Sequence, residues 1–140
     1  MDDLESVGEL YERDGYVVAR GVVGPQWVRA ADEHVRATIA RHEGVPYARL
    51  HQIPFWREDP FYLSLVRQPG MLDLAERFLG PDLALFAAGY IVKPPASAME
   101  VLWHQDGSYW PLEPMEVCTL WLAITESDTG NGCMRVIRGS

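Results

Sequence analysis

Hydrophobic residues recur at helical spacing through the first eighty residues of the chain. A first helix is predicted over residues 3–13, because four apolar residues would share one of its faces: Leu4, Val7, Leu10 and Tyr11. Gly15 fits the end of that helix, since glycine readily adopts the left-handed backbone of a C-terminal cap. Pro25 suits the first position of a second and stronger helix. The apolar residues of that helix recur every four positions: Trp27, Ala31, Val35 and Ile39.

Polar residues mark the surface and the ends of the helices in this part of the chain. His34 and His42 lie off the apolar positions of the second helix, and we interpret both as solvated surface residues. Asp59, followed by a proline, is typical of the N-cap of a third helix. Pro69 and the glycine after it are expected to interrupt that helix, so that residues 71–79 form a separate short one.

From residue 82 the pattern changes to that of extended chain. Apolar or alternating stretches rich in β-branched and aromatic residues predict four strands, over residues 83–92, 101–106, 117–124 and 133–137. In the third stretch the side chains alternate between two faces, as they would in a sheet. Helices followed by strands predict an α+β fold in a single domain, residues 1–140, with a helical lead-in over 1–81 and a strand part over 82–140.

The composition is that of one soluble globular domain, with 140 residues, 48% hydrophobic and 23% charged. The net charge is -8 and Lys93 is the sole lysine, so no basic surface favours nucleic acid or an anionic membrane as a partner. No apolar run approaches the ~20 residues of a membrane helix, and the acidic N-terminus lacks the features of a secretion signal. Cys118 and Cys133 are too few for a disulfide framework, so we expect a cytoplasmic protein.

The segment from Trp103 to Trp110 carries the candidate chemistry. His104 and Asp106 are two residues apart, and on extended backbone two such side chains point to the same side. An imidazole and a carboxylate at one point make two thirds of the 2-His-1-carboxylate triad that binds Fe(II). The pair by itself is a weak signal, because a histidine is more often a satisfied polar residue than a ligand. The flanking aromatic residues are typical of a small pocket around a few polar groups.

A wider set of motifs resembles the phytanoyl-CoA dioxygenase family of Fe(II)/2-oxoglutarate-dependent oxygenases. The resemblance is clearest over residues 50–140. It rests on these residues: Lys93-Pro94-Pro95, His104-Gln105-Asp106, Tyr109-Trp110-Pro111, Trp121, Asn131-Gly132-Cys133, Val136-Ile137 and Gly139-Ser140. By this resemblance the strand part would be the first part of a double-stranded β-helix, a cupin-like jelly roll, with the helices packed outside it.

The resemblance also implies roles for individual residues. His104 and Asp106 would be iron ligands and catalytic residues, and Asp106 indicates hydroxylation, because related halogenases lack this carboxylate. The 2-oxoglutarate would be approached by four residues: Gln52, Gly89, Gln105 and Trp121. Gln52 stands where a family member has lysine, so it would supply a hydrogen bond without a charge. Trp121 is equally well explained as a core residue, and Gln52 as a surface amide.

Tyr109 and Trp110 would line the mouth of the substrate site, or would simply cover the end of a sheet. Two family residues find no match in the chain: the second iron histidine, which none of the other histidines replaces, and the arginine that binds the far carboxylate of 2-oxoglutarate. We therefore expect the chain to be the front part of a longer oxygenase, and to bind metal weakly and be inactive alone. Arg138 stands where proline is usual, and nothing in the sequence interprets it.

The sequence thus predicts an Fe(II)-, 2-oxoglutarate- and O2-dependent dioxygenase that hydroxylates a small organic molecule. The main alternative is a non-catalytic jelly-roll binding module or inactive truncated relative, which keeps the metal pair but has lost the chemistry. A third interpretation is a structural α+β domain in which the His-x-Asp pair arose by chance. A histidine and an arginine supplied downstream of the chain would favour the enzyme over both alternatives.

Overall fold

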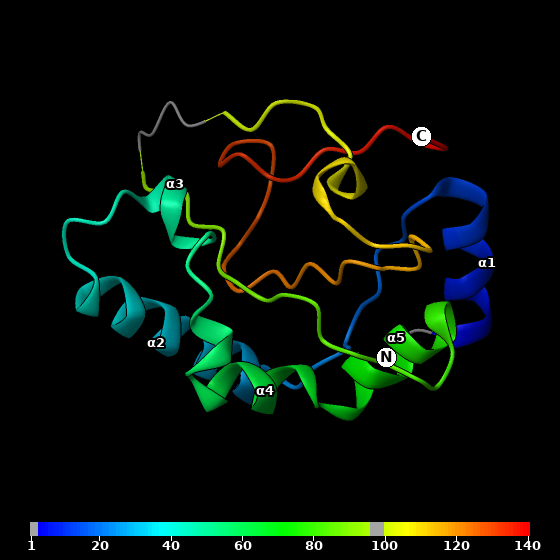
Figure 1. The fold of residues 1–140 in the computed structure, drawn as a ribbon, viewed down its shortest axis with the longest axis horizontal. Helices are drawn as coiled ribbons and strands as arrows, with labels where there is room; N and C mark the ends of the chain where they lie inside the picture. Colours follow the sequence, from blue (N-terminus) through cyan, green and yellow to red (C-terminus); the bar gives the residue numbers. More distant parts are fainter. Residues whose placement is uncertain (1–2, 96–99) are drawn as a thin grey trace.

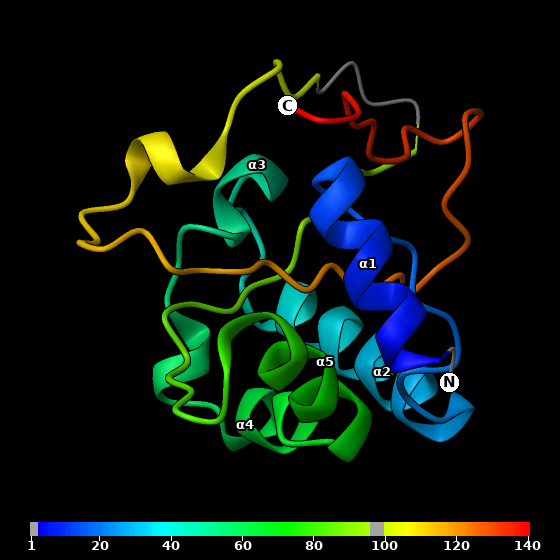
Figure 2. The ribbon, with the colours of Figure 1, turned by 90° about the vertical axis from the view of Figure 1, so that its right-hand side faces the viewer.

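The computed structural model of the protein describes residues 3–95 and 100–140. The regular elements in these ranges are α1 (Leu4–Asp14), α2 (Pro25–Arg41), α3 (Tyr47–Leu50), η1 (Phe55–Arg57), α4 (Pro60–Val66), α5 (Pro69–Leu79) and η2 (Asp106–Tyr109), where η marks a 3₁₀ turn. Helices α2, α4 and α5 form a helical layer on one side of the molecule (Figures 1 and 2). Helix α1 stands at one edge of this layer, and the extended second half of the chain crosses its other side.

Local sequence signals set the ends of the helices, and Gly15 and Asp59 act at the helix ends predicted for them. The Asp3 carboxylate accepts a hydrogen bond from the Ser6 N–H at 3.2 Å, which caps the start of α1. Gly15 has a φ of 77° and its N–H donates to the Tyr11 carbonyl at 2.8 Å, which ends the same helix. The expected start of a short helix at residue 71 is wrong. Pro69 instead opens α5, because a proline at the first helical position lacks only an N–H that would have no helical partner.

The core of the protein lies among the helices. Helix α1 packs against α5, where the rings of Tyr11 and Phe78 lie 4.4 Å apart between centroids. The buried hydrophobic residues in the described part of the chain are Val7, Ala31, Leu50, Tyr62, Leu65, Met71, Leu74 and Tyr90. All but Tyr90 belong to the first eighty residues, so the helices supply the core and the second half of the chain rests on it.

The prediction of four strands, and with it of an α+β jelly roll, is wrong. The described residues contain no β-strand, and those from 82 onwards form only extended chain and the 3₁₀ turn η2. A strand requires a hydrogen-bonded ladder with a partner strand, and β-propensity cannot specify that partner. Alternation of the side chains does survive: over residues 118–124, half-buried residues alternate with the exposed Thr119, Trp121 and Ala123. The pattern therefore correctly indicated extended backbone with one covered face, but not pairing.

Side-chain contacts hold this extended chain in place instead of a ladder. The Lys93 ammonium donates to the Gly132 carbonyl at 2.8 Å and joins two segments of the second half. Arg138 donates to the Asp14 carboxylate at 2.6 Å, and the Gly139 N–H donates to the Asp14 carbonyl at 2.7 Å. Arg138, which the sequence left without an interpretation, thus ties the last residues to the C-terminal end of α1.

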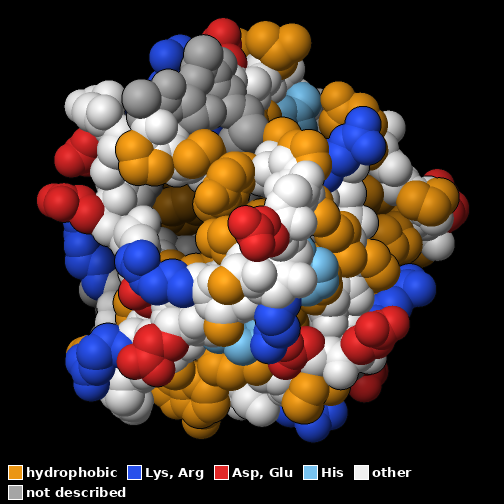
Figure 3. Space-filling view, turned by 90° about the vertical axis from the view of Figure 1, so that its left-hand side faces the viewer, with side chains coloured by type: hydrophobic (Ala, Val, Ile, Leu, Met, Phe, Trp, Pro, Cys, Tyr) orange, Lys and Arg blue, Asp and Glu red, His pale blue; other side chains and the backbone are white. Residues whose placement is uncertain are grey.

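Several large apolar side chains remain exposed on the second half of the chain. Leu102 is 75% exposed and Trp103 is 57% exposed. On the face drawn in Figure 3, hydrophobic side chains gather around a hollow, with charged side chains towards its periphery.

Among the described residues, no helix is both long and apolar enough to cross a membrane.

We expect the packing of α5 to carry much of the stability. Leu74 is only 4% exposed, whereas Leu72 on the same helix is 41% exposed. Leu74→Ala should lower the free energy of unfolding by about 2 to 4 kcal/mol, because it removes buried methyl groups and leaves a cavity. Leu72→Ala, the matched control, should change it by less than about 1 kcal/mol. Urea unfolding measures both, and equal losses in the two variants would contradict the position of the core.

Candidate metal site

The side chains of His104 and Asp106 converge. The His104 Nε2 lies 3.2 Å from the Asp106 Oδ1. The residue between them, Gln105, has extended backbone with φ -117° and ψ 124°, and Asp106 begins the 3₁₀ turn η2. The extended residue turns both side chains to one side, and the turn that follows it is closed by the Ser108 N–H, which donates to the Gln105 carbonyl at 3.1 Å. The 3₁₀ turn was not predicted, and only its first residue, Asp106, lies in the strand predicted over residues 101–106.

A backbone carbonyl fixes the orientation of the His104 ring. The ring Nδ1 lies 2.7 Å from the Leu102 carbonyl oxygen, which can only accept, so Nδ1 carries a proton and donates it. The other ring nitrogen, Nε2, therefore faces Asp106. The hydrogen bond to Leu102 has the largest effect and raises the pKa of His104; burial opposes it, and the charge and hydrogen bond of Asp106 raise the pKa further. A cation between these two groups, either a proton on Nε2 or a metal ion, would be attracted to both of them.

The chemistry of the two donors fits a divalent metal ion. Metal bonds to imidazole nitrogen and carboxylate oxygen are about 2.1 Å long, so two such ligands at about a right angle have their donor atoms about 3 Å apart. A metal-bound histidine commonly donates its second N–H to a backbone carbonyl, as His104 does to Leu102. The described residues hold no group of three His, Cys, Asp or Glu that could bind a metal. His104 and Asp106 therefore offer two donors, and the rest of a coordination sphere would come from elsewhere.

One aromatic side chain, that of Tyr109, lies beside the pair, whereas the two neighbouring tryptophans pack on other residues. The ring of Tyr109 lies 6.1 Å from that of His104, and Tyr109 is 73% exposed. Trp110 turns away and packs edge-on against Phe86, with 5.5 Å between ring centroids. Trp103, just before His104, receives the guanidinium of Arg135 over its ring at 5.0 Å. The two residues expected at a substrate mouth are thus separated: Tyr109 stays beside the pair, whereas Trp110 joins the surface of the extended chain.

Two of the four residues expected near 2-oxoglutarate lie in one place. A Cβ added at Gly89 would lie 3.3 Å from the carbonyl oxygen of His51 and 3.6 Å from its Cα, so the segment around Gly89 passes directly beside the backbone that precedes Gln52. Gln52 follows α3 and is exposed. Trp121 is 42% exposed on the open face of the extended chain, and therefore is not a core residue.

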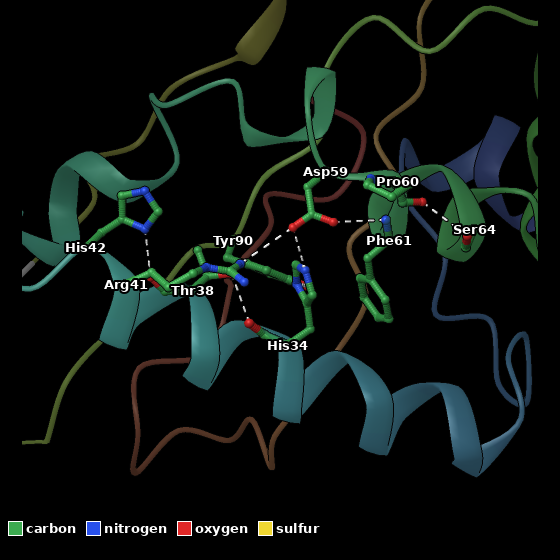
Figure 4. A network of polar contacts seen from close by, with 9 residues as sticks. All are labelled: His34, Thr38, Arg41, His42, Asp59, Pro60, Phe61, Ser64 and Tyr90. Atoms are coloured by element: carbon green, nitrogen blue, oxygen red, sulfur yellow. Dashed lines mark hydrogen bonds and ion pairs between the residues drawn. The ribbon is translucent and has the colours of Figure 1, made fainter.

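Sequence reasoning missed a polar network in the helical layer (Figure 4). The two ring nitrogens of His34 lie 2.8 Å from the Tyr90 hydroxyl and 2.8 Å from the Asp59 carboxylate. The side chain of His34 is only 14% exposed, and its ring stacks on Phe61 at 4.1 Å. His42 is half-buried against Phe55 and hydrogen-bonds the Thr38 carbonyl. The interpretation of both as solvated surface histidines is therefore wrong.

A signal for His34 was present in the sequence. The residues of α2 that face the core alternate in steps of four and three, namely Trp27, Ala31, His34 and Thr38, and two of them, Ala31 and Thr38, are almost fully buried. The constant step of four used for the prediction drifts around a helix of 3.6 residues per turn, so by Ile39 it had left the buried face. Steps of four and three follow one face and would have placed His34 inward.

Known proteins show which class these features belong to. A family model described as phytanoyl-CoA dioxygenase (PhyH) matches residues 11–140. A probable alpha-ketoglutarate-dependent hypophosphite dioxygenase of Stutzerimonas stutzeri is 36% identical over 77 residues, which is 55% of this chain and 27% of that protein. A phytanoyl-CoA dioxygenase of Arabidopsis thaliana is 32% identical over 82 residues, 59% of this chain and 29% of the relative. An ectoine dioxygenase of Bordetella parapertussis is 24% identical over 146 aligned residues, 94% of this chain and 47% of the relative. No solved structure matches.

These relatives are dioxygenases, an enzyme class that agrees with a histidine and a carboxylate meeting at one point. The family model covers most of the chain, and the chain belongs to the phytanoyl-CoA dioxygenase family. The resemblance seen in the sequence is thereby confirmed. The chain spans between about a quarter and a half of the length of these three relatives.

The Asp59 carboxylate gives the network a pH dependence. Burial acts to raise its pKa, but the Phe61 N–H and the contacts with His34 and Arg41 together outweigh burial and lower the pKa. A lowered pKa contributes stability that is complete above the ordinary aspartate pKa of about 4 and is lost as the pH falls through the lowered value.

Asp59→Asn should therefore reduce the free energy of unfolding by an amount that is constant between pH 7 and about pH 5 and shrinks below about pH 4. Urea unfolding at a series of pH values measures this difference. Asp82→Asn at an exposed carboxylate is the control and should show little difference at any pH. A loss in Asp59→Asn that is the same at pH 3 and pH 7 would contradict the role of the charge.

Proposed function

We propose that His104 and Asp106 are two protein ligands of Fe(II) in a 2-oxoglutarate-dependent dioxygenase that hydroxylates a small organic molecule. The observation that carries this proposal is the 3.2 Å separation of the His104 Nε2 and the Asp106 Oδ1. Membership of the phytanoyl-CoA dioxygenase family supports it, as does a relative whose name specifies alpha-ketoglutarate dependence.

Each of the two residues has a defined role in this proposal. The Leu102 carbonyl holds the proton of His104 on Nδ1, so a neutral ring presents the lone pair of Nε2 to the ion. Asp106 adds a negative charge, which offsets part of the charge of Fe(II). When bound, Fe(II) together with 2-oxoglutarate and O2 would supply the oxidation of a substrate C–H bond to an alcohol. Both residues would bind the ion through an atom that carries no proton: Nε2 of His104 and a carboxylate oxygen of Asp106.

The co-substrate would lie on the side of Gly89 and Gln52. A Cβ at Gly89 would lie 3.3 Å from the His51 carbonyl oxygen, so a larger side chain there would press on the backbone of this edge. The Gln52 amide would donate a hydrogen bond to a carboxylate of 2-oxoglutarate. Gln105 and Trp121 would contact it from the second half of the chain.

The surroundings of the pair favour a substrate with an apolar part. Tyr109 stands beside His104 and presents most of its ring to solvent. The relatives' names specify hypophosphite, phytanoyl-CoA and ectoine, which have little chemistry in common. The substrate class is therefore inferred from the aromatic residue at the site and not transferred from one relative.

The second candidate function is a non-catalytic binding module. The described residues provide two metal donors and no third one, and the two side chains are 37% and 47% exposed. Such a pair binds a metal ion weakly, because water competes for the exposed site and weakens the attraction between the ion and the carboxylate. Metal binding without turnover would be the property of this module.

A titration with Mn(II), which stands in for Fe(II) without oxidation, tests the proposed ligands. We expect weak one-to-one binding that His104→Ala and Asp106→Ala each weaken at least about tenfold, since each removes one of two protein donors. Asp82→Asn, the control, removes an exposed carboxylate outside the pair and should leave the affinity unchanged. Equal Mn(II) affinity in the wild-type chain and in a double His104→Ala/Asp106→Ala variant would overturn the assignment.

Succinate release separates the two candidate functions. With Fe(II), 2-oxoglutarate, air and a segment of a relative that supplies the further donors, the dioxygenase should release succinate, and Asp106→Ala should abolish this release. A chain that binds Mn(II) through the pair but releases no succinate under these conditions is the binding module.

A further inference from the structure

Tyr90 is the one deeply buried residue in the second half of the described chain. It is 7% exposed, and all other described residues after Gly80 are half-buried or exposed. Its hydroxyl reaches the helical layer and meets the Nδ1 of His34 at 2.8 Å. Its ring lies 5.2 Å from that of Tyr62 in α4. The buried Tyr90 side chain therefore anchors the extended chain on the helical layer.

The direction of each hydrogen bond follows from the chemistry of the three groups. Asp59 is ionised, because its pKa is lowered, and a carboxylate only accepts. The Nε2 of His34 therefore carries a proton and donates it to Asp59 at 2.8 Å. In the tautomer with its proton on Nε2 alone, Nδ1 has a lone pair, to which the Tyr90 hydroxyl donates. Burial raises the pKa of Tyr90, so the hydroxyl keeps its proton.

Both helical members of this network are held by further contacts. The second oxygen of the Asp59 carboxylate accepts from the Phe61 N–H at 3.0 Å, which caps α4. The guanidinium of Arg41 lies 3.5 Å from the same carboxylate. The His34 ring is stacked on Phe61. Figure 4 shows His34, Thr38 and Arg41 along α2 with Asp59 above them and Tyr90 between the two elements. The acceptor offered to Tyr90 is thus fixed in position by two helices.

A fixed acceptor sets the register of the segment that carries Tyr90. Side chains alternate along this segment, since Tyr90 is buried between the exposed Gly89 and Ile91. A shift by one residue would turn Tyr90 outward and would bring a side chain against the His51 backbone, where a Cβ at position 89 already lies 3.3 Å from the carbonyl oxygen. The hydrogen bond to His34 therefore keeps Gly89 beside His51, and beside Gln52 that follows it.

We infer that His34 and Asp59 are positioning residues for the 2-oxoglutarate edge of the site, and that they act through Tyr90. This inference rests on the proposed function, in which Gly89 and Gln52 contact the co-substrate. The network does not contact the metal pair, which lies in a different segment. Its loss should therefore weaken the binding of 2-oxoglutarate and leave the binding of the metal ion alone unchanged.

The test compares two tyrosines that each lose one hydroxyl. Tyr90→Phe removes the hydrogen bond to His34, whereas Tyr62→Phe removes a buried hydroxyl for which the described residues offer no hydrogen-bond partner. Both rings are almost fully buried and pack on each other. Tyr62→Phe is therefore a matched control for packing and for purification.

Titration calorimetry gives two affinities for each variant: that of Mn(II) alone, and that of 2-oxoglutarate at saturating Mn(II). Tyr90→Phe should weaken 2-oxoglutarate about tenfold, because it leaves a buried ring nitrogen unpaired and frees the register, and should leave Mn(II) affinity within about twofold. Tyr62→Phe should leave both affinities at the wild-type value. A second variant, His34→Gln, breaks the network from α2 with Tyr90 in place and should show the same selective loss.

Two results in the variants would overturn the inference. Unchanged 2-oxoglutarate affinity in Tyr90→Phe and in His34→Gln would remove the link between the network and the co-substrate. Parallel losses of Mn(II) and 2-oxoglutarate affinity would show a role in stability only. The wild-type titrations test the assumptions beneath the inference. A wild-type chain that binds Mn(II) but not 2-oxoglutarate would refute the co-substrate edge. A wild-type chain that binds no Mn(II) would refute the proposed function itself.

Discussion

The second half of the chain has no hydrogen-bonded ladder among its described residues, so a few side-chain contacts determine where it lies. The most important is the insertion of Tyr90 between α2 and α4, where its ring is buried and its hydroxyl finds the acceptor on His34. A buried tyrosine contributes apolar contact area and requires a partner for its hydroxyl, and both are satisfied at this one point. The ion pair of Arg138 with Asp14 and the bond of Lys93 to the Gly132 carbonyl fix the chain further along.

This arrangement explains why the pair of His104 and Asp106 is open to solvent. His104 and Asp106 are oriented locally, by the Leu102 carbonyl and by the turn that starts at Asp106. Their convergence therefore does not depend on the rest of the fold. The affinity and selectivity of a metal site do depend on it, because they require further donors and shielding from water. The geometry thus places the two proposed ligands together on an exposed part of the chain that also carries large apolar side chains.

The sequence predicted those features that are determined within a few residues. Helix ends at Gly15 and Asp59 follow from the conformations and hydrogen bonds that these residues favour. The spacing of His104 and Asp106 correctly indicated that their side chains meet. The prediction of paired strands was wrong because a ladder needs a partner strand from elsewhere in the sequence, and β-propensity carries no information about that partner. The role of Arg138 was missed for the same reason, since Asp14 lies 124 residues earlier in the chain.

His34 was missed for a different reason. Its inward position was encoded locally, in the alternating steps of four and three along α2, and a histidine on such a face must find polar partners when it is buried. Those partners, Tyr90 and Asp59, come from two other parts of the chain, so the network itself was not readable from the sequence. The proposed role of Gly89 and Gln52 near 2-oxoglutarate came from the family resemblance. We infer that the Tyr90 contact keeps these two residues close together.

The proposed metal site depends most directly on the His104 ring, which must keep its proton on Nδ1 and turn Nε2 towards Asp106. The ¹⁵N NMR signals of the histidine rings can be followed while Zn(II), a diamagnetic substitute for Fe(II), is added to the chain. We expect the Nε2 signal of His104 to shift, its Nδ1 to stay protonated, and the ring signals of His34 to remain unchanged. A His104 ring that does not respond, or a first response at another histidine, would contradict the proposed metal site.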